Sequence, residues 1–169
     1  MRRLRVVRVY KGLKSGGGVH NRLLELLPRL AEHVDVRLLC YRSRGDRAEE
    51  LESLGIPVDV IPLKHKWSPA TVARFAGYLE RVGAEVVHAH EYTANTLAIA
   101  AAVRARVPVR IRHIHSLTPY GRVGRLKGSL RRRLDRWAAR RAHLTWAVSE
   151  AARARYLALS GLPPETSQV

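Results

Sequence analysis

Cysteine, phenylalanine and methionine each occur only once in this sequence of 169 residues. The single cysteine, Cys40, excludes an intrachain disulfide and a cysteine-rich metal site. No apolar run reaches the ~18 residues that are needed to cross a bilayer. The apolar segment that follows Met1, Arg2 and Arg3 is too short for a signal peptide. We therefore expect a cytoplasmic protein without a membrane span.

Acidic residues are also scarce. The chain has 31 lysines and arginines against 14 aspartates and glutamates, which gives a formal net charge of +17. Such an excess is compatible with an acidic partner, which could be an anionic membrane surface, a nucleic acid or a phosphorylated substrate. The alternative is that the arginine content reflects arginine-rich coding or a hot habitat. The length corresponds to one domain, and a hydrophobic content of 46% is enough for a globular core.

Short apolar runs alternate with segments whose apolar residues recur at helical spacing. Strands are expected at residues 4–10, 34–41, 58–62, 85–88, 109–113 and 144–148. Helices are expected at residues 19–30, 46–54, 68–82, 93–104, 122–142 and 149–160. This alternation predicts an α/β fold: a Rossmann-like open parallel sheet of about six strands with helices on both faces. The expected strand order is 3-2-1-4-5-6.

Two local signals refine the helices. Pro28 lies inside the first helical pattern and is expected to kink or shorten that helix. Asp46 begins a segment that resembles a capping box, and Gly55 is a plausible stop for the same helix.

Three consecutive glycines, Gly16, Gly17 and Gly18, lie between the first strand and the first helix. Glycine permits a close approach of the backbone to a ligand, and free N–H groups at a helix start favour an anion. The spacing is neither the dinucleotide fingerprint nor a Walker loop. The alternatives are a flexible turn without a ligand and, favoured by its position, a phosphate-binding turn.

Histidine is frequent, with eight residues in the chain. His88 and His90 alternate at the end of the fourth predicted strand, and His113 and His115 repeat that spacing at the end of the fifth. Residues two apart on a strand face the same side, and carboxyl ends of parallel strands share one edge. We expect a binding cleft there. No metal is expected, because Glu91 is the only obvious acidic companion and no cysteine is near.

The segment from Arg122 to Arg141 contains nine basic residues and one acid, Asp135. An apolar stripe at helical spacing is expected to pack against the sheet, which leaves a basic face free. That face is a solvated surface, a contact for anionic membrane or a nucleic-acid contact, of which the last is disfavoured because aromatic residues are not interleaved. The stripe consists of Val123, Leu126, Leu130, Leu134 and Trp137. The candidate anion contacts are Arg125, Lys127, Arg131, Arg132 and Arg133.

Several of these motifs resemble the N-terminal domain of retaining GT-B glycosyltransferases of family 4. The motifs are Gly17-Gly18-Val19, His88-Ala89-His90-Glu91, and the pair Arg140-Arg141-Ala142 and Ala147-Val148-Ser149-Glu150. The resemblance covers nearly all 169 residues, which we interpret as a single Rossmann-like domain, residues 1–169. It implies that these residues form the acceptor-binding half of the enzyme. The C-terminal donor-binding domain is expected to lie outside this chain, so that the 169 residues alone are expected to be inactive.

The resemblance also assigns roles. It implies transfer of a sugar, of the hexosyltransferase type, from a nucleotide-sugar to a lipid-linked or glycan acceptor, with retention and without a metal or other cofactor. It places Gly16, Gly17 and Gly18 against the donor and His90 against the transferred sugar as the catalytic residue. It implies acceptor contacts at a further set of side chains. That set is His20, Asn21, Glu91 and His115.

Two other functions remain open. One is a non-catalytic basic module that binds anionic membrane or nucleic acid. The other is a related GT-B enzyme, either an inverting transferase or a sugar epimerase. The chain departs from the family pattern at His20, where an acidic residue is usual, and at Pro28. If the basic helix meets lipid, we expect peripheral association with the inner face of the cell membrane.

Overall fold

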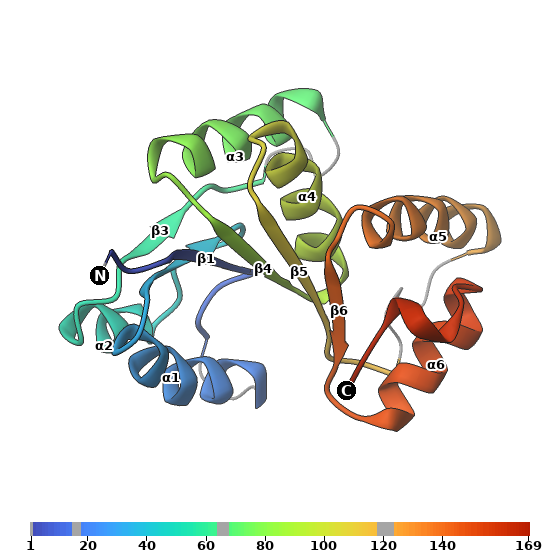
Figure 1. The fold of residues 1–169 in the computed structure, drawn as a ribbon, viewed down its shortest axis with the longest axis horizontal. Helices are drawn as coiled ribbons and strands as arrows, with labels where there is room; N and C mark the ends of the chain where they lie inside the picture. Colours follow the sequence, from blue (N-terminus) through green and yellow to red (C-terminus); the bar gives the residue numbers. More distant parts are fainter. Residues whose placement is uncertain (1, 15–17, 64–67, 118–123) are drawn as a thin grey trace.

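Six parallel strands form one sheet in the order β3-β2-β1-β4-β5-β6 (Figure 1). The computed structural model describes residues 2–14, 18–63, 68–117 and 124–169. The strands are β1 (Arg5–Tyr10), β2 (Asp35–Cys40), β3 (Val58–Val60), β4 (Val86–His90), β5 (Val109–Ile114) and β6 (Leu144–Ala147). The predicted fold class and strand order are confirmed.

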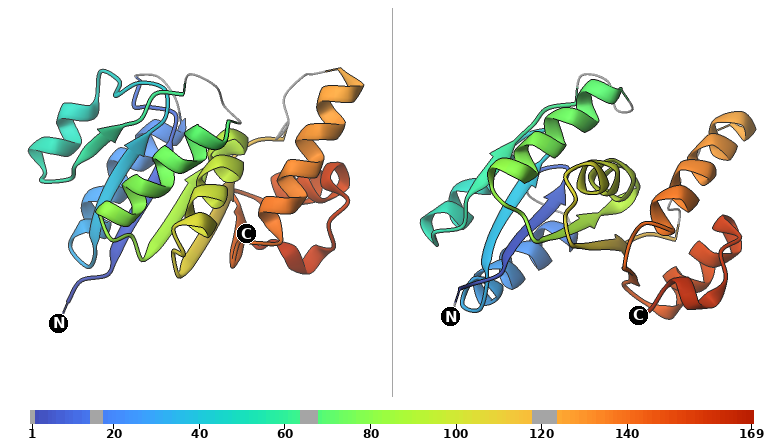
Figure 2. Two further views of the ribbon diagram at one scale, coloured as in Figure 1. Left: turned by 90° about the horizontal axis from the view of Figure 1, so that it is seen from above. Right: turned by 45° about the horizontal axis from the view of Figure 1, so that its top comes forward.

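The helices connect successive strands and cover both faces of the sheet (Figures 1 and 2). They are α1 (Gly18–Ala31), α2 (Ala48–Ser53), α3 (Pro69–Arg81), α4 (Glu91–Arg104), α5 (Arg125–Ala139) and α6 (Glu150–Ser160), followed by the 3-10 helix η1 (Pro164–Thr166). None of the helices in the described ranges is long and apolar enough to cross a membrane.

Alternation along the strands separates two cores. Val7 and Val9 of β1 pack with α3 and α4, whereas Val6 and Tyr10 of the same strand pack with α1 and α2. Successive strand residues point to opposite faces, so β1 contributes to both cores. Ile114 of β5 and Ala147 of β6 pack in a third cluster with α6. Both faces of the sheet are covered, which is why even polar strand residues such as Arg8, His88 and Arg112 are buried.

The fourth strand is longer than its sequence pattern predicts. β4 continues to His90, where the prediction ended at His88, and α4 begins directly at Glu91 rather than at Thr93. The added residues pair with β5, because His90 is the register partner of His113. Strand pairing therefore extends β4 beyond its apolar run and places both histidines within the sheet.

The sequence predicts that Pro28 kinks or shortens the first helix, and of these two outcomes the shortening is wrong. α1 contains Pro28 and continues to Ala31. Leu23 and Leu27, on the buried side of the helix, are each at most 1% exposed. Burial of these side chains stabilises the helix enough to offset the hydrogen bond that proline cannot donate. The predicted capping box is also wrong: α2 begins after Arg47, whose side chain makes no capping hydrogen bond, although Gly55 does have the left-handed backbone of a helix stop.

The expectation that the apolar stripe of α5 packs on the sheet is also wrong for its first half. Leu126 is 88% exposed and Leu130 is 57% exposed. The buried face of α5 is formed instead by Gly128, Asp135 and Ala138. Asp135 is held inside the protein by its ion pair with Arg112 of β5, and this orientation of the helix leaves Leu126 and Leu130 exposed. Val123 lies outside the described residues.

Candidate functional site

Four histidine rings gather on the face of β4 and β5 that also carries α1. His88 stacks on His90 with ring centroids 4.6 Å apart, and His113 stacks on His115 at 4.1 Å. The two pairs meet, since His88 and His113 lie 5.4 Å apart and His90 and His115 lie 5.0 Å apart. The expectation that the two histidine pairs converge at one edge of the sheet is therefore confirmed.

A hydrogen bond joins the two strands within this cluster. Nδ1 of His90 lies 2.8 Å from Nε2 of His115. The Nε2 atoms of His88 and His90 and the Nδ1 atom of His113 are buried and have no hydrogen-bond partner. One ring nitrogen from each of these three residues lies within 4.8 Å of the others, so they are the group among the described residues that could hold a metal ion.

Burial keeps these imidazoles neutral. Removal from water disfavours the charged form and holds the pKa of His88 and His90 well below the ordinary value. The same cause lowers the pKa of His113 to about 3 and that of His115 to about 4. The nearby guanidinium of Arg8 adds to each shift by repelling a second positive charge. At neutral pH the cluster offers both lone pairs and N–H donors.

Arg8 is a functional candidate that the sequence pattern did not reveal. It is the register partner of His88 on β1 and is only 6% exposed. Its Nε atom is buried without a hydrogen-bond partner, and burial lowers its pKa to about 10. The sequence pattern predicts only a strand at this arginine, because one basic residue within an apolar run carries no signal of its own.

The start of α1 joins the cluster through Tyr10. The Tyr10 ring lies 5.2 Å from the His20 ring and 6.2 Å from the His90 ring. His20 is buried, and neither of its ring nitrogens has a hydrogen-bond partner. Gly18, the first residue of α1, therefore belongs to the same edge of the sheet as His90. Gly16 and Gly17 lie outside the described residues.

Glu91 lies between the cluster and the end of β1. Its Oε1 atom accepts hydrogen bonds from Tyr10 Oη at 3.5 Å and from Lys11 Nζ at 3.4 Å. Its backbone has φ of +67°, in the left-handed region that residues other than glycine avoid. Strained backbone of this kind persists where surrounding contacts enforce it, often at functional sites. Here the left-handed conformation of Glu91 lets the chain pass from β4 directly into α4.

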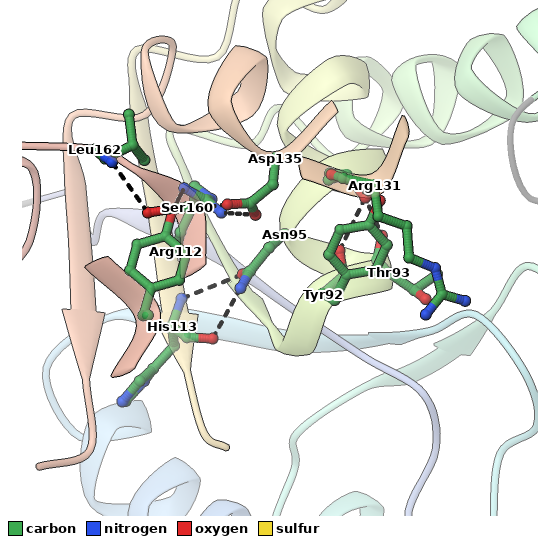
Figure 3. A network of polar contacts seen from close by, with 11 residues as sticks. Tyr92, Thr93, Asn95, Arg112, His113, Arg131, Asp135, Ser160 and Leu162 are labelled. Carbon is green, nitrogen blue, oxygen red and sulfur yellow. Dashed lines mark hydrogen bonds and ion pairs between the residues drawn. The ribbon is translucent and has the colours of Figure 1, made fainter. Parts of the chain in front are cut away.

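A side-chain amide fixes the position of His113. Asn95 Nδ2 donates to the carbonyl oxygen of His113 at 2.9 Å, and the His113 N–H donates to Asn95 Oδ1 at 3.2 Å (Figure 3). Asn95 is fully buried in α4. The amide thus replaces a neighbouring strand at this point and holds β5 against the helix.

A hollow of about 350 Å³ lies beyond the carboxyl ends of β1, β2 and β3. It is lined by Lys11, Tyr41, Arg42, Pro62 and Leu63. Lys11 belongs both to this hollow and to the ion pair with Glu91. The hollow is therefore connected through Lys11 to Glu91, the residue after His90, and its lining includes two cations, Lys11 and Arg42.

The remaining predicted residues are dispersed. Asn21 is exposed and accepts a hydrogen bond from Arg47 at 3.0 Å, so its amide is engaged by the segment before α2. On α5, Arg125, Lys127 and Arg133 are exposed, whereas Arg131 and Arg132 are half-buried. The guanidinium of Arg131 lies over the Tyr92 ring at 5.5 Å. Only part of the predicted basic surface is therefore fully open to solvent.

The model of the glycosyl transferase 4-like domain family matches residues 17–169. The chain belongs to the glycosyl transferase 4-like domain family. Comparison with curated proteins gives no significant match.

Solved structures share the fold of this glycosyl transferase 4-like domain. HepE of Anabaena, in complex with UDP and glucose, has a TM-score of 0.75 at 18% identity, over 98% of this chain and 43% of that one. The lipopolysaccharide outer core galactosyltransferase WaaB has a TM-score of 0.67 at 14% identity, over 98% and 45%. A UDP-GlcNAc 2-epimerase from Methanocaldococcus jannaschii has a TM-score of 0.60 at 13% identity, over 98% and 45%.

The glycosyl transferase 4-like domain thus spans less than half the length of each of these proteins. At identities of this size the similarity establishes the fold, which is the Rossmann-like half found in GT-B glycosyltransferases.

Proposed function

We propose that this chain is the acceptor-binding half of a glycosyltransferase that moves a sugar from a nucleotide-sugar to a lipid-linked or glycan acceptor with retention of configuration. The observation that carries the proposal is that the Tyr10 ring contacts both His90 and His20, and that His20 lies in the first turn of α1, two residues after Gly18. Ligands of open α/β sheets bind at this edge. Family membership supports transfer over the epimerase alternative.

The donor is proposed to approach the turn between β1 and α1. A Cβ atom added to Gly18 would meet nothing within 4 Å, so the packing of the protein itself does not require glycine there. The first N–H groups of α1 form the positive end of the helix dipole and suit a diphosphate. HepE was crystallised with UDP, which makes a uridine nucleotide the first donor to test.

The acceptor is proposed to occupy the hollow beside Lys11 and Arg42 and to extend towards Glu91 and His115. Two cations at this position suit an acceptor that carries a phosphate or a carboxylate. The neutral imidazole of His90 would donate or accept a hydrogen bond at the transferred sugar. In this arrangement catalysis depends on orientation of the substrates and on stabilisation of phosphate charge, without a metal cofactor.

His90→Gln in the protein at its full natural length tests this proposal. The amide preserves polarity and much of the volume, so the variant should fold while turnover falls by about 100-fold or more. Release of nucleotide from UDP-glucose and other nucleotide-sugars measures turnover. His33→Gln is the matched control, because His33 is exposed and distant from the cluster in the sequence. A normal rate in His90→Gln would contradict the assigned role.

We further propose that α5 brings the protein to an anionic membrane, where a lipid-linked acceptor resides. The exposed Leu126 and Leu130 share a shallow hollow with Lys127 and Arg133. Exposed leucines flanked by cations suit the boundary between acyl chains and anionic headgroups. α5 lies beside α6, on the side of the molecule opposite α2 (Figures 1 and 2).

Sedimentation with vesicles of phosphatidylglycerol and phosphatidylcholine tests the membrane contact. Leu126→Ser combined with Leu130→Ser should weaken binding at physiological salt, and Lys127→Gln with Arg133→Gln should weaken it further at low salt. Leu54→Ser is the control, since Leu54 is 60% exposed at the end of α2. Equal binding of all variants would contradict the membrane contact and indicate that the exposed face of α5 is an ordinary solvated surface. Vesicle binding without any nucleotide release would favour the non-catalytic module.

A further inference from the structure

We propose that His88, His90 and His113 form a binding site for a transition-metal dication of the zinc class. Two ligands at positions i and i+2 of β4 and a third on the neighbouring strand β5 project from one face of the sheet. One ring nitrogen from each residue lies within 4.8 Å of the others. Small movements of the rings would bring three nitrogens to the distances of about 2.0–2.1 Å at which zinc binds imidazole.

The unsatisfied nitrogens point independently to a ligand. The Nε2 atoms of His88 and His90 are buried and make no hydrogen bond, and these two residues are only 4% and 2% exposed. Nδ1 of His113 is buried and unpaired as well. A buried polar atom without a hydrogen-bond partner lowers the stability of the fold. A single cation that binds all three nitrogens would satisfy them together.

His115 completes the arrangement from outside the ligand set. When Nε2 of His90 supplies a lone pair, its proton resides on Nδ1, which then donates to Nε2 of His115 across 2.8 Å. Metal-binding histidines commonly have such a partner on the second nitrogen, which fixes the tautomer and the ring orientation. Because all three ligands are neutral and nitrogenous, the site suits zinc or cobalt rather than magnesium or calcium.

Arg8 is expected to influence which ligand occupies the fourth position on the metal. The side chain of Arg8 is buried, and Arg8 is the register partner of His88 on the neighbouring strand β1. A fixed positive charge opposes a bare dication and favours an anionic fourth ligand, such as hydroxide or chloride, on the metal. Replacement of Arg8 with an apolar residue should therefore strengthen metal binding. If the cluster is instead an anion site, the same replacement should weaken the binding of an anion such as inorganic phosphate.

This site goes beyond the proposed transferase function. A metal on Nε2 of His90 would make that nitrogen unavailable to the sugar, so zinc is expected to inhibit transfer. The decisive readout is metal binding itself. The metal site can therefore fail without affecting the transferase proposal, and transfer can be absent while the metal still binds.

The experiment uses chelator-stripped protein at its full natural length. Zn²⁺ binding is measured by equilibrium dialysis, and Co²⁺ is added as a spectroscopic substitute whose visible absorption reports a four-coordinate nitrogen site. His88→Gln and His113→Gln should each weaken Zn²⁺ binding by more than about 100-fold, and His115→Ala by about 10- to 100-fold. Arg8→Leu should tighten Zn²⁺ binding, and His33→Gln should leave it unchanged.

Circular dichroism and thermal unfolding without metal show which variants fold. If His88→Gln does not fold, the half-buried His113 provides the test alone. The proposal is overturned if the wild-type protein binds no Zn²⁺, or if His88→Gln and His113→Gln bind it as the wild type does. Binding of inorganic phosphate that is lost in Arg8→Leu, without Zn²⁺ binding, would identify an anion site and also overturn it.

Discussion

The guanidinium of Arg112 on β5 and the carboxylate of Asp135 on α5 form an ion pair whose side chains are 0% and 2% exposed (Figure 3). The hydroxyl of Tyr156 on α6 donates to Asp135 Oδ2 at 2.8 Å and accepts from Arg112 at 3.1 Å. Side chains from β5, α5 and α6 therefore form one buried polar network. This network also fixes the rotation of α5 and leaves its leucines exposed.

Removal of the Asp135 carboxylate should strongly destabilise the fold. Asp135→Leu is expected to lower the free energy of unfolding by about 3–5 kcal/mol, because it leaves the buried Arg112 without its counter-charge. Urea denaturation measures the change. The double variant Arg112→Leu with Asp135→Leu should recover a large part of the loss. Glu50→Gln, which breaks the exposed pair with Arg47, should leave the urea midpoint unchanged. An Asp135→Leu protein as stable as the wild type would show that the pair is not needed.

Asn95 should be required to hold the end of β5. Asn95→Ala removes both hydrogen bonds to the backbone of His113 and leaves buried polar groups unpaired, so a loss of about 2–3 kcal/mol in the free energy of unfolding is expected. Amide hydrogen exchange at His113 should accelerate more than exchange in β1. Unaltered exchange at His113 would mean that the amide does not hold the strand.

Replacement of Glu91 should affect stability and sugar transfer in opposite directions. Glu91→Gly relieves the φ of +67° and is expected to raise the free energy of unfolding by up to about 1 kcal/mol, while sugar transfer falls because the carboxylate beside Lys11 is lost. Arg106, with φ of +53° at the end of α4, is the matched control. Arg106→Gly should bring a similar gain in stability with unchanged transfer. A loss of stability in both variants would refute the strain argument.

Gly18 should matter for the donor and not for folding. Gly18→Ala adds a methyl group in open space at a helix start, so stability should be unchanged or rise by up to about 1 kcal/mol. The KM for the nucleotide-sugar should rise because the methyl group hinders close approach of the diphosphate. Gly77→Ala within α3, also in open space, should stabilise the protein without any change in KM. Equal KM values for the two variants would remove Gly18 from the donor site.

Cys40 should be unreactive in the folded protein. Burial raises the pKa of its thiol to about 12, so only a minute fraction is thiolate at pH 8. Iodoacetamide should modify Cys40 slowly in native conditions and rapidly in urea, as followed by peptide mass spectrometry. Rapid modification of the native protein would show that β2 opens locally.

The amino-acid sequence by itself determined the layered fold. Apolar periodicity separates strands from helices, and short connections between them permit few topologies, so the strand order followed from the pattern. The spacing of His88 and His90, repeated at His113 and His115, likewise predicted which residues would meet. These features are local or follow from general rules for parallel sheets.

Only the tertiary structure decided which side chains complete the site. The pairing of His90 with His113 depends on strand register, and the proximity of Arg8 to the histidines depends on the neighbouring positions of β1 and β4. The exposed face of α5 was predicted incorrectly because a buried ion pair, formed between residues far apart in the chain, outweighs the pull of its leucines towards the core. Periodicity records the average burial of a segment, whereas such pairings depend on contacts that exist only once the sheet has assembled.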